Sequence, residues 1–263
     1  CLDWAPELTS VQDYADIAAA VQRIYEELFT KLLIATRRLT HSDNLVLMGG
    51  CALNCVANTL AYKYFNNVWI MPNPGDAGSA IGCVLAHYKQ HIKFNTAFLG
   101  HNIAGEYPVD KIIQELVENK ITAVAAGRAE FGPRALGNRS ILADPRGADV
   151  KDRVNNIKQR ESFRPFAPMI LEEYAHDYFD MPAQLISSQY MQFVVKCKYP
   201  DQFPAITHYD GTSRVQTVGV NDGPIRQLLE AWHKRTGCPM LLNTSLNIRG
   251  EPLVNTRADA ERW

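Results

Sequence analysis

The sequence predicts an α/β domain followed by an α+β domain. Helical patterns alternate with short apolar runs over residues 1–92, the periodicity fades over 93–104, and short apolar runs dominate 105–263. Alternation of helices with strands is typical of a sheet covered by helices. Because a domain usually contains about 100–200 residues, the 263 residues of the chain fit two modest domains joined by a linker at 93–104.

The first predicted domain opens with a long helix. Ile17, Val21 and Ile24 begin a series of apolar residues at helical spacing, continued by Leu28 and Leu32, over residues 11–39. Further helices and buried strands alternate after it. In chain order they are a strand at 45–48, a helix at 51–64, a strand at 68–71, a turn at 72–75 and a helix at 78–91.

The second predicted domain is richer in strands. Apolar runs bounded by polar or glycine-containing turns predict its strands, and amphipathic spacing predicts its helices. The predicted strands are 121–126, 169–171, 191–198, 215–220 and 240–242, and the predicted helices are 109–119 and 225–235.

Composition argues against several classes of protein. A net charge of −1 provides no general attraction to nucleic acid or anionic membranes, and no apolar run reaches the roughly 18 residues of a membrane span. The six cysteines lack paired CxxC spacing, so we expect reduced thiols and a cytoplasmic protein. The chain opens at Cys1 without a methionine and stops at Trp263 inside a predicted helix, so we expect a fragment of a longer protein.

Two turns of the first domain are candidate ligand sites. Gly49 and Gly50 let the backbone approach a ligand, and the helix that follows, with Asn54, offers free N–H groups to a phosphate. A strand–helix turn without a ligand would explain the same residues. Asp76 lies beside the start of a helix, where it would either cap the helix or act as an oxygen ligand to a metal or to metal-bound phosphate.

Charged and polar side chains that could bind a ligand are most concentrated in residues 127–140. Arg134 and Arg139 stand among glycines, beside Glu130 and Asn138. Guanidinium groups bind phosphate or carboxylate oxygens bidentately, whereas a solvated charge run is usually helical and rich in Lys and Glu. This block therefore predicts an anion-binding site.

A second group of cations precedes the predicted strand at 169–171. In an extended segment, Lys158, Arg160 and Arg164 would share one side of the backbone, where they would form a second phosphate clamp. A basic surface patch is the alternative.

Small polar residues follow the predicted strand at 240–242. These residues are Asn243, Thr244, Ser245 and Asn247. Their side chains could line a nucleotide or carbamoyl site, or could form hydrogen bonds with the neighbouring backbone. Arg214, in a polar loop, is a further candidate cation. A serine hydrolase is hard to support, because the sequence contains no Gly-x-Ser-x-Gly motif.

Four segments together resemble the NodU/CmcH-type O-carbamoyltransferases, the family of nodulation-factor, cephamycin and tobramycin carbamoylating enzymes; the segments are 49–54, 130–140, 164–168 and 243–247. The resemblance implies the C-terminal portion of a Kae1-like domain, with an actin-type ATPase (ASKHA) fold, over 1–92, and a YrdC-like domain over 105–263. The YrdC-like domain would form carbamoyl-adenylate from carbamoyl phosphate and ATP with Mg²⁺. The Kae1-like domain would pass the carbamoyl group to a hydroxyl of a small-molecule acceptor. No nucleic-acid or membrane partner is implied, and a homodimer is compatible with the resemblance.

The resemblance also implies roles for residues. Asp76 resembles the carboxylate ligand of the family's Fe²⁺, and Gly49, Gly50 and Asn54 resemble its nucleotide-binding turn. Lys158 with Arg160 or Arg164, and Ser245 with Asn247, resemble the KxR…SxN cluster of YrdC-type domains. The full set of expected catalytic residues is Lys158, Arg160, Arg164, Arg134 and Arg139, and the other residues expected to bind nucleotide or carbamoyl phosphate are Glu130, Asn138, Arg214, Asn243 and Thr244.

One feature of the family is absent from the sequence. Its iron site needs a His-x-x-x-His pair from the N-terminal half. His87 and His91 have this spacing on the predicted helix 78–91, but they follow Asp76, so we interpret them as surface histidines. We therefore expect this chain to bind iron poorly and not to complete carbamoyl transfer alone.

Two other functions remain open. The threonylcarbamoyl-AMP chemistry of tRNA modification uses the same two folds, although the neutral charge and the Gly-Pro-Arg-Ala-Leu-Gly block argue against it. The second is a non-catalytic nucleotide-binding scaffold, although a scaffold would have no obvious use for this set of Arg, Lys, Ser and Asn residues.

Overall fold

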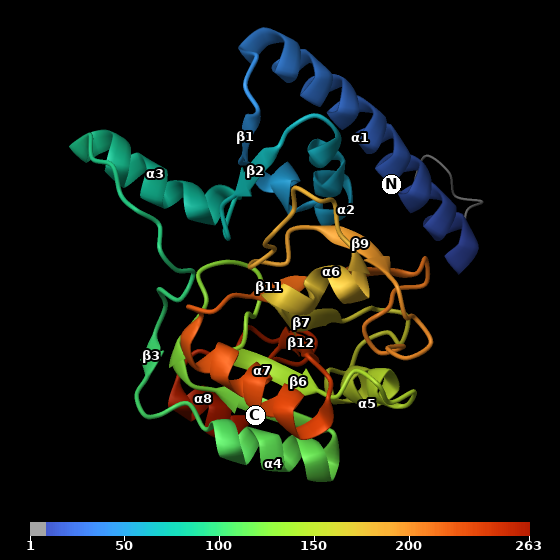
Figure 1. Ribbon diagram of the computed structural model, residues 1–263, viewed down its shortest axis with the longest axis vertical. Helices are drawn as coiled ribbons and strands as arrows, with labels where there is room; N and C mark the ends of the chain where they lie inside the picture. Colours follow the sequence, from blue (N-terminus) through green and yellow to red (C-terminus); the bar gives the residue numbers. More distant parts are fainter. Residues whose placement is uncertain (1–8) are drawn as a thin grey trace.

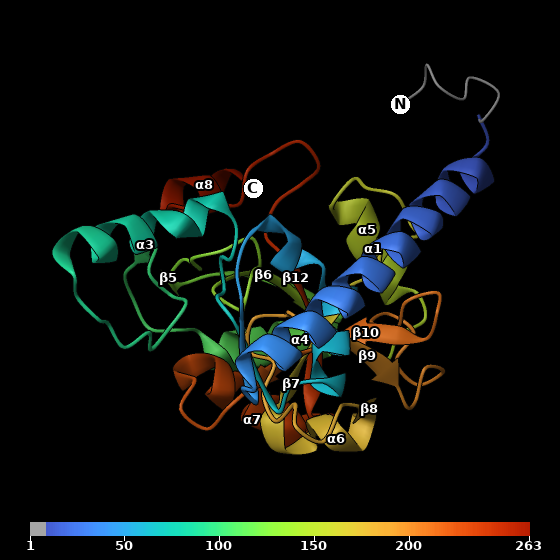
Figure 2. The ribbon, with the colours of Figure 1, turned by 90° about the horizontal axis from the view of Figure 1, so that it is seen from above.

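A computed structural model describes residues 9–263. The long helix α1 (Val11–Thr40) extends away from the body of the protein (Figures 1 and 2) and begins with a capping box in which Ser10 and Asp13 exchange hydrogen bonds. The predicted helix at 11–39 is confirmed. Only Phe29 and Leu33 of α1 are buried, whereas Leu28 is 59% exposed, because the apolar cluster that α1 packs against is small.

The rest of the first part contains a two-stranded parallel sheet of β1 (Asn44–Leu47) and β2 (Asn67–Ile70). The predicted single helix at 51–64 is wrong. It is divided into η1 (Gly50–Leu53), α2 (Cys55–Asn58) and η2 (Thr59–Lys63). Asn54 interrupts the helix because its ψ of 81° lies outside the helical region, and its side chain accepts the N–H of Ala57 to cap α2.

The helix α3 (Asp76–Tyr88) projects from the opposite side of the molecule to α1 (Figure 1). Lys89 ends it in the left-handed conformation, with φ of 52°. His91 therefore lies beyond the helix, and the expectation that His87 and His91 share one helix is wrong.

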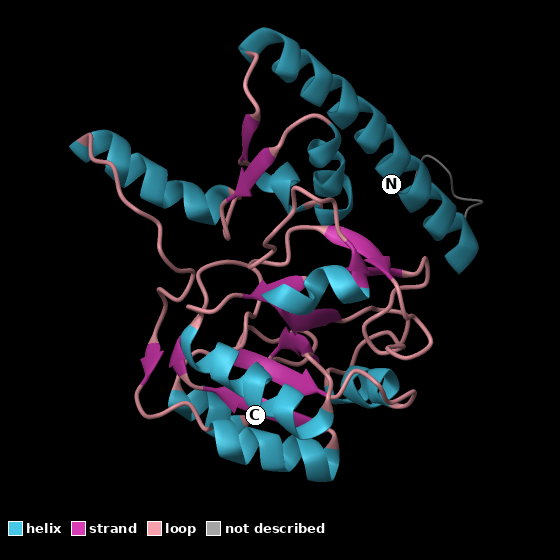
Figure 3. Cartoon of the chain, in the orientation of Figure 1, coloured by secondary structure: helices cyan, strands magenta, loops and turns pink. Residues whose placement is uncertain are grey.

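The second part is built on a five-stranded mixed sheet in the order β11-β7-β12-β6-β4. The β11–β7 pair is parallel and the other pairs are antiparallel. The helices α4 (Val109–Asn119) and α7 (Gly223–Thr236) pack against each other and against this sheet (Figures 1 and 3). The strands are β4 (Ile121–Ala125), β6 (Arg139–Ala143), β7 (Ala167–Leu171), β11 (Gln216–Val218) and β12 (Met240–Ser245).

Smaller elements complete the second part. The strands β8 (Phe179–Asp180), β9 (Val194–Cys197) and β10 (Thr212–Arg214) form an antiparallel sheet, and β3 (Asn102–Ile103) pairs with β5 (Gly127–Arg128). The short helices are α5 (Val150–Ile157), η3 (Glu172–Tyr174), α6 (Ala175–Tyr178) and α8 (Arg257–Arg262). The mixed α/β architecture is as predicted, while the division into domains at 92 and 105 stays a prediction.

Hydrogen bonds between side chains and backbone join the two parts. Gln192 donates from Nε2 to the carbonyls of Ile70 and Met71, at 2.9 and 2.8 Å. In the other direction, Asn58 donates to the Gln192 carbonyl at 3.0 Å, and Thr59 donates to Val194 at 2.9 Å. The main core also includes Ala52 and Ile70 of the first part. Over residues 9–263, none of the helices combines the length and apolar character needed to cross a membrane.

Candidate anion-binding site

Glu130 organises the loop between β5 and β6. One oxygen of its buried carboxylate accepts the backbone N–H groups of Leu136, Asn138 and Arg139, at 2.8, 2.9 and 3.3 Å. The Asn138 side chain in turn donates to the Arg128 carbonyl at 2.8 Å. Glu130 and Asn138, expected to bind the ligand, therefore hold the loop in shape.

Arg139 is fully buried and is not available to a phosphate in this structure. Its guanidinium donates to backbone carbonyls between 2.9 and 3.2 Å away, and these belong to His101, Ala126, Gly127, Asn138 and Asn255. Each guanidinium nitrogen is engaged, and a guanidinium has five N–H donors in all. The structure thus gives Arg139 a structural position rather than the predicted phosphate-binding one.

Arg134 lies at the tip of the same loop, next to the first part of the chain. It lines a small cavity together with Ala52, Leu53 and Gln192. Burial and then the neighbouring Arg214 guanidinium lower the pKa of Arg134 to about 10, the direction expected for a cation without a carboxylate partner. Arg134 remains charged at neutral pH, and its guanidinium has no hydrogen-bond or carboxylate partner among residues 9–263.

Arg214 connects the Arg134 loop electrostatically with a second group of cations. Its Nε atom is buried without a hydrogen-bond partner within the part of the chain that the structure describes. Arg214 also contributes to lowering the pKa of Arg160 and, after the larger effect of burial, that of His208, which falls to about 4. His208 is therefore neutral at pH 7, and the local charge comes from the arginines.

Lys158 forms the centre of the second group. It follows α5 and is only 4% exposed. Its Nζ donates to the carbonyl and hydroxyl of Ser245 and to the carbonyl and side-chain oxygen of Asn247, the last two at 2.9 and 3.0 Å. Burial, Arg160 and Arg164 lower the pKa of Lys158 to about 8. The structure therefore brings together the predicted Lys158, Ser245 and Asn247.

Arg160 and Arg164 complete this group, although the segment is not the extended strand that the sequence predicted. Gln159 has a left-handed φ of 50°, so the chain turns sharply after α5. Arg160 donates to the Asn155 side chain at 2.7 Å and lies 4.4 Å above the Phe166 ring. Burial and then Arg164 lower the pKa of Arg160 to about 10.

These cations line an open cleft of about 230 Å³. Arg249, which sequence reasoning missed, lies at its edge. The sequence signal that could have identified Arg249 is its position two residues after Asn247 of the Ser-x-Asn pattern. The lining residues are Lys158, Arg160, Arg164, Ser245, Asn247, Ile248, Arg249 and Gly250.

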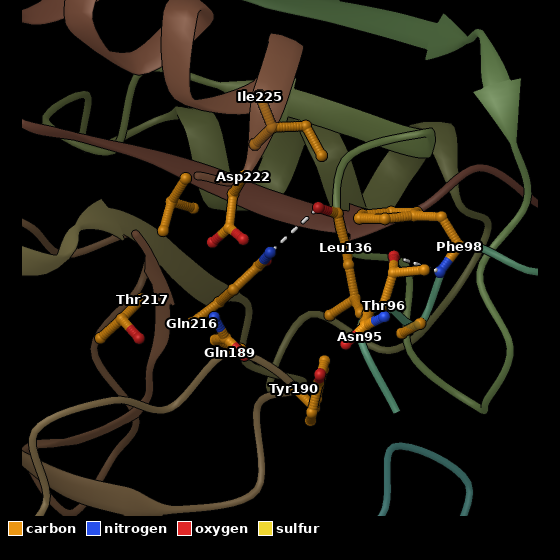
Figure 4. Close-up of a pocket in the computed structure, with 12 residues that line it drawn as sticks. Asn95, Thr96, Phe98, Leu136, Gln189, Tyr190, Gln216, Thr217, Asp222 and Ile225 are labelled. Atoms are coloured by element: carbon orange, nitrogen blue, oxygen red, sulfur yellow. Dashed lines mark hydrogen bonds between the residues drawn. The ribbon is translucent and has the colours of Figure 1, made fainter. Parts of the chain in front are cut away.

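Asn243 and Thr244 lie outside the cleft. Asn243 is buried and donates to the Ala135 carbonyl at 3.1 Å and to Gln216 at 2.8 Å. Gln216 donates to the Leu136 carbonyl at 2.9 Å, beside a cavity of only about 50 Å³ (Figure 4). Thr244 lies within the β12–β6 ladder. Asn243 and Gln216 therefore hold the backbone of the Arg134 loop through the Ala135 and Leu136 carbonyls. Neither residue lines the cleft.

The two predicted turns of the first part lie side by side. Gly49, with φ of 93°, donates its N–H to the Pro74 carbonyl at 2.7 Å. Asn54 exchanges two hydrogen bonds with the Gln22 side chain of α1, at 2.9 and 3.2 Å. Its side chain is thus already engaged in joining α1 to the turn.

Asp76 is the first residue of α3 and is exposed, and Gly75 rather than Asp76 occupies the N-cap position. Within residues 9–263, no three His, Cys, Asp or Glu side chains are grouped so that they could hold a metal ion. Because Asp76 offers a single carboxylate, the described residues alone do not fit an iron site. No step of the chemistry below depends on iron.

Comparison with known proteins identifies the class. A model described as "Carbamoyltransferase N-terminus" matches residues 5–85, and one described as "Carbamoyltransferase C-terminus" matches residues 113–263. The chain belongs to the carbamoyltransferase family.

Several curated relatives resemble the chain over most of its length. Nodulation protein NolNO of Sinorhizobium fredii is 35% identical, with 95% of this chain and 41% of the relative covered. Nodulation protein NolO of Bradyrhizobium diazoefficiens is 35% identical, with 95% and 51% covered. Nodulation protein U of Sinorhizobium fredii is 36% identical, with 86% and 43% covered. The chain spans about half of the length of the curated relatives that it matches.

Proposed function

We propose that this chain carries the carbamoyl-activating part of an ATP-dependent O-carbamoyltransferase. One observation carries the proposal, namely that cations from distant segments line one cleft and that Arg214 acts electrostatically on both Arg160 of this cleft and Arg134. Lys158 and Arg160 come from the segment after α5, Arg214 from β10 and Arg134 from the loop before β6. Membership of the carbamoyltransferase family supports carbamoyl phosphate as the carbamoyl source.

The proposed reaction brings two highly charged reactants together. Water releases carbamate and phosphate from carbamoyl phosphate. An oxygen of carbamate then attacks the α-phosphorus of ATP, the bond from that phosphorus to the bridging oxygen of the β-phosphate breaks, and pyrophosphate leaves. The products are carbamoyl-adenylate, phosphate and pyrophosphate. Negative charge on the phosphate oxygens is best stabilised by cations that are already in place, and Mg²⁺ would enter on the phosphates of ATP rather than in a protein cage.

Within this proposal the cations have distinct tasks. Arg160 and Arg164 would hold phosphate oxygens. Lys158 would fix the Ser245–Asn247 turn and add its charge to the cleft. Arg134 would bind the reactant portion nearest the first part of the chain. The YrdC-like assignment of residues 105–263 belongs to this proposal.

The second step would take place at the paired turns of the first part, in a Kae1-like domain. An acceptor hydroxyl would attack the carbamoyl carbon of carbamoyl-adenylate, lose its proton, and release AMP. Nothing lies within 4 Å of a Cβ position at Gly49 or Gly50, so the turn leaves open space that a nucleotide phosphate could occupy.

A pyrophosphate-release assay tests the proposal. ATP with carbamoyl phosphate should release pyrophosphate, whereas ATP with threonine and bicarbonate should not. Arg134→Ala should slow the release at least about tenfold, because the loss of one pre-placed charged donor usually costs 10²–10³ in rate.

Arg128→Ala is the matched control. Arg128 is an exposed arginine of the same block and donates to the carbonyls of Leu99 and Gly100. We expect its variant to remain within about twofold of the wild type, since an exposed contact contributes little. Pyrophosphate release driven by threonine, or an Arg134→Ala variant as fast as Arg128→Ala, would refute the proposed function.

A further inference from the structure

We infer that Arg249 is an additional anion-binding residue at the edge of the cleft, and that Glu161 is a resident counter-charge which a phosphate ligand displaces. The inference rests on the proposed function and deepens it, because it assigns an entry mechanism and a charge preference to the same cleft.

Glu161 bridges two arginines that come from different segments. Its Oε1 lies 2.9 Å from Nη1 of Arg249, and its Oε2 lies 3.8 Å from Nε of Arg164. Arg164 belongs to the segment after α5, and Arg249 belongs to the turn after β12. One carboxylate therefore occupies the position between two guanidinium groups that a phosphate would otherwise take.

The backbone of Arg249 is held by hydrogen bonds, whereas its side chain lies largely in solvent. The Arg249 N–H donates to the Lys158 carbonyl at 3.0 Å, and the Asn247 side chain donates to the Glu251 carbonyl at 3.0 Å. The Arg249 side chain itself is 65% exposed. Arg249 can therefore change partner without disturbing the Lys158 cluster.

The charges of the cleft favour this exchange. Lys158, Arg160, Arg164 and Arg249 line it and contribute four positive charges, against one negative charge from Glu161, which leaves a net charge of 4 − 1 = +3. A solvent-exposed ion pair usually contributes only about 0–1 kcal/mol. A phosphate that contacts both guanidinium groups forms several charge-assisted hydrogen bonds.

A charge preference follows from the displacement. A singly charged anion would only replace the charge of Glu161, so its binding would gain little electrostatic free energy. A doubly or more highly charged phosphate would replace it and still neutralise a further cation. The edge of the cleft should therefore select for multiply charged phosphates.

Calorimetric titration of the chain with inorganic pyrophosphate tests the inference. Arg249→Met should weaken binding about tenfold, which corresponds to about 1.4 kcal/mol. Glu161→Gln should tighten it about threefold or more, and this gain should shrink in the double variant, because Arg249 would already be absent. Arg164→Met, within the proposed site, should weaken binding as well.

Arg23→Met is the matched control, because Arg23 is 83% exposed and forms an exposed pair with Glu27 on α1. Its binding should equal that of the wild type. If Arg164→Met weakens binding while Arg249→Met does not, or if Glu161→Gln weakens it, the inference is overturned and the proposed function stands. If the wild-type chain does not bind pyrophosphate, both are overturned.

Discussion

Arg134 and Arg139 lie in one loop, but their guanidinium groups have different surroundings. Arg139 donates to carbonyls that include those of His101 and Asn255, whereas Arg134 lies beside Arg214 and faces a cavity. Residue type and spacing predicted an anion site in this block, and for Arg134 this stays a prediction. They could not distinguish the two arginines, because the carbonyls that engage Arg139 are supplied by distant parts of the chain.

Lys158 allows a prediction at the scale of a single side chain. Its pKa is lowered to about 8, chiefly by burial. A bound anion favours the charged form and raises a lysine pKa. NMR titration of the ¹³Cε signal of Lys158, assigned by its loss in Lys158→Arg, should therefore give about 8 without ligand and a higher value with ATP. An unchanged pKa in saturating ATP would show that the nucleotide binds elsewhere.

The sign of the linked stability effect follows from the same lowered pKa. The unfolded chain holds the Lys158 proton up to its ordinary pKa of 10.5, whereas the folded chain releases it near 8. Between these values the unfolded state binds more protons, so the contribution of Lys158 to the free energy of unfolding rises with pH. Below pH 8 the buried ammonium opposes folding, and a bound anion would offset this cost.

At the scale of elements, hydrophobic periodicity predicted the long helices and the main strands, including 109–119 and 121–126. It failed where a polar side chain caps the backbone locally, as Asn54 does within the predicted helix 51–64. It also failed at residues 158–164, where Gln159 takes a left-handed conformation that no sequence pattern indicated. The cations of that segment nevertheless converge, because the turn and not a strand face brings them together.

The Arg134 loop depends on a close approach of two backbones. A Cβ at Gly132 would lie 2.6 Å from the Pro72 carbonyl oxygen, and φ at Gly132 is 147°. Gly132→Ala should lower the free energy of unfolding by about 1–3 kcal/mol more than Gly105→Ala, because it adds overlap to backbone strain. Gly105 is the matched control, since it has φ of 126° and nothing within 4 Å of its Cβ position.

Urea denaturation of the two variants measures this difference. Equal losses would mean that the loop can move away from Pro72 without cost, and that its approach to the first part does not fix Arg134.

At the scale of the whole molecule, Gln192 holds the two parts together through the carbonyls of Ile70 and Met71. Gln192→Ala should reduce the overall stability by about 1–3 kcal/mol, the usual cost of leaving buried acceptors unpaired. The larger effect should be local. Hydrogen exchange should accelerate in β1 and β2 more than in the five-stranded sheet, because the small sheet would lose its attachment.

Gln114→Ala is the control, since Gln114 is an exposed residue of α4 that bonds only Glu118 among the described side chains. It should leave exchange in both sheets unchanged. Uniform acceleration in the Gln192→Ala variant would instead mean that the two parts unfold as one cooperative unit.

The surroundings of Arg139 have a consequence for the order of assembly. Asn255, one of its acceptors, lies 116 residues further along the chain, and closing such a long loop costs entropy and slows folding. Until Asn255 is in place, the Arg139 guanidinium must stay hydrated on that side, and the β5–β6 loop lacks these hydrogen bonds. During synthesis, the β5–β6 loop should therefore reach its final arrangement only after Asn255 has left the ribosome.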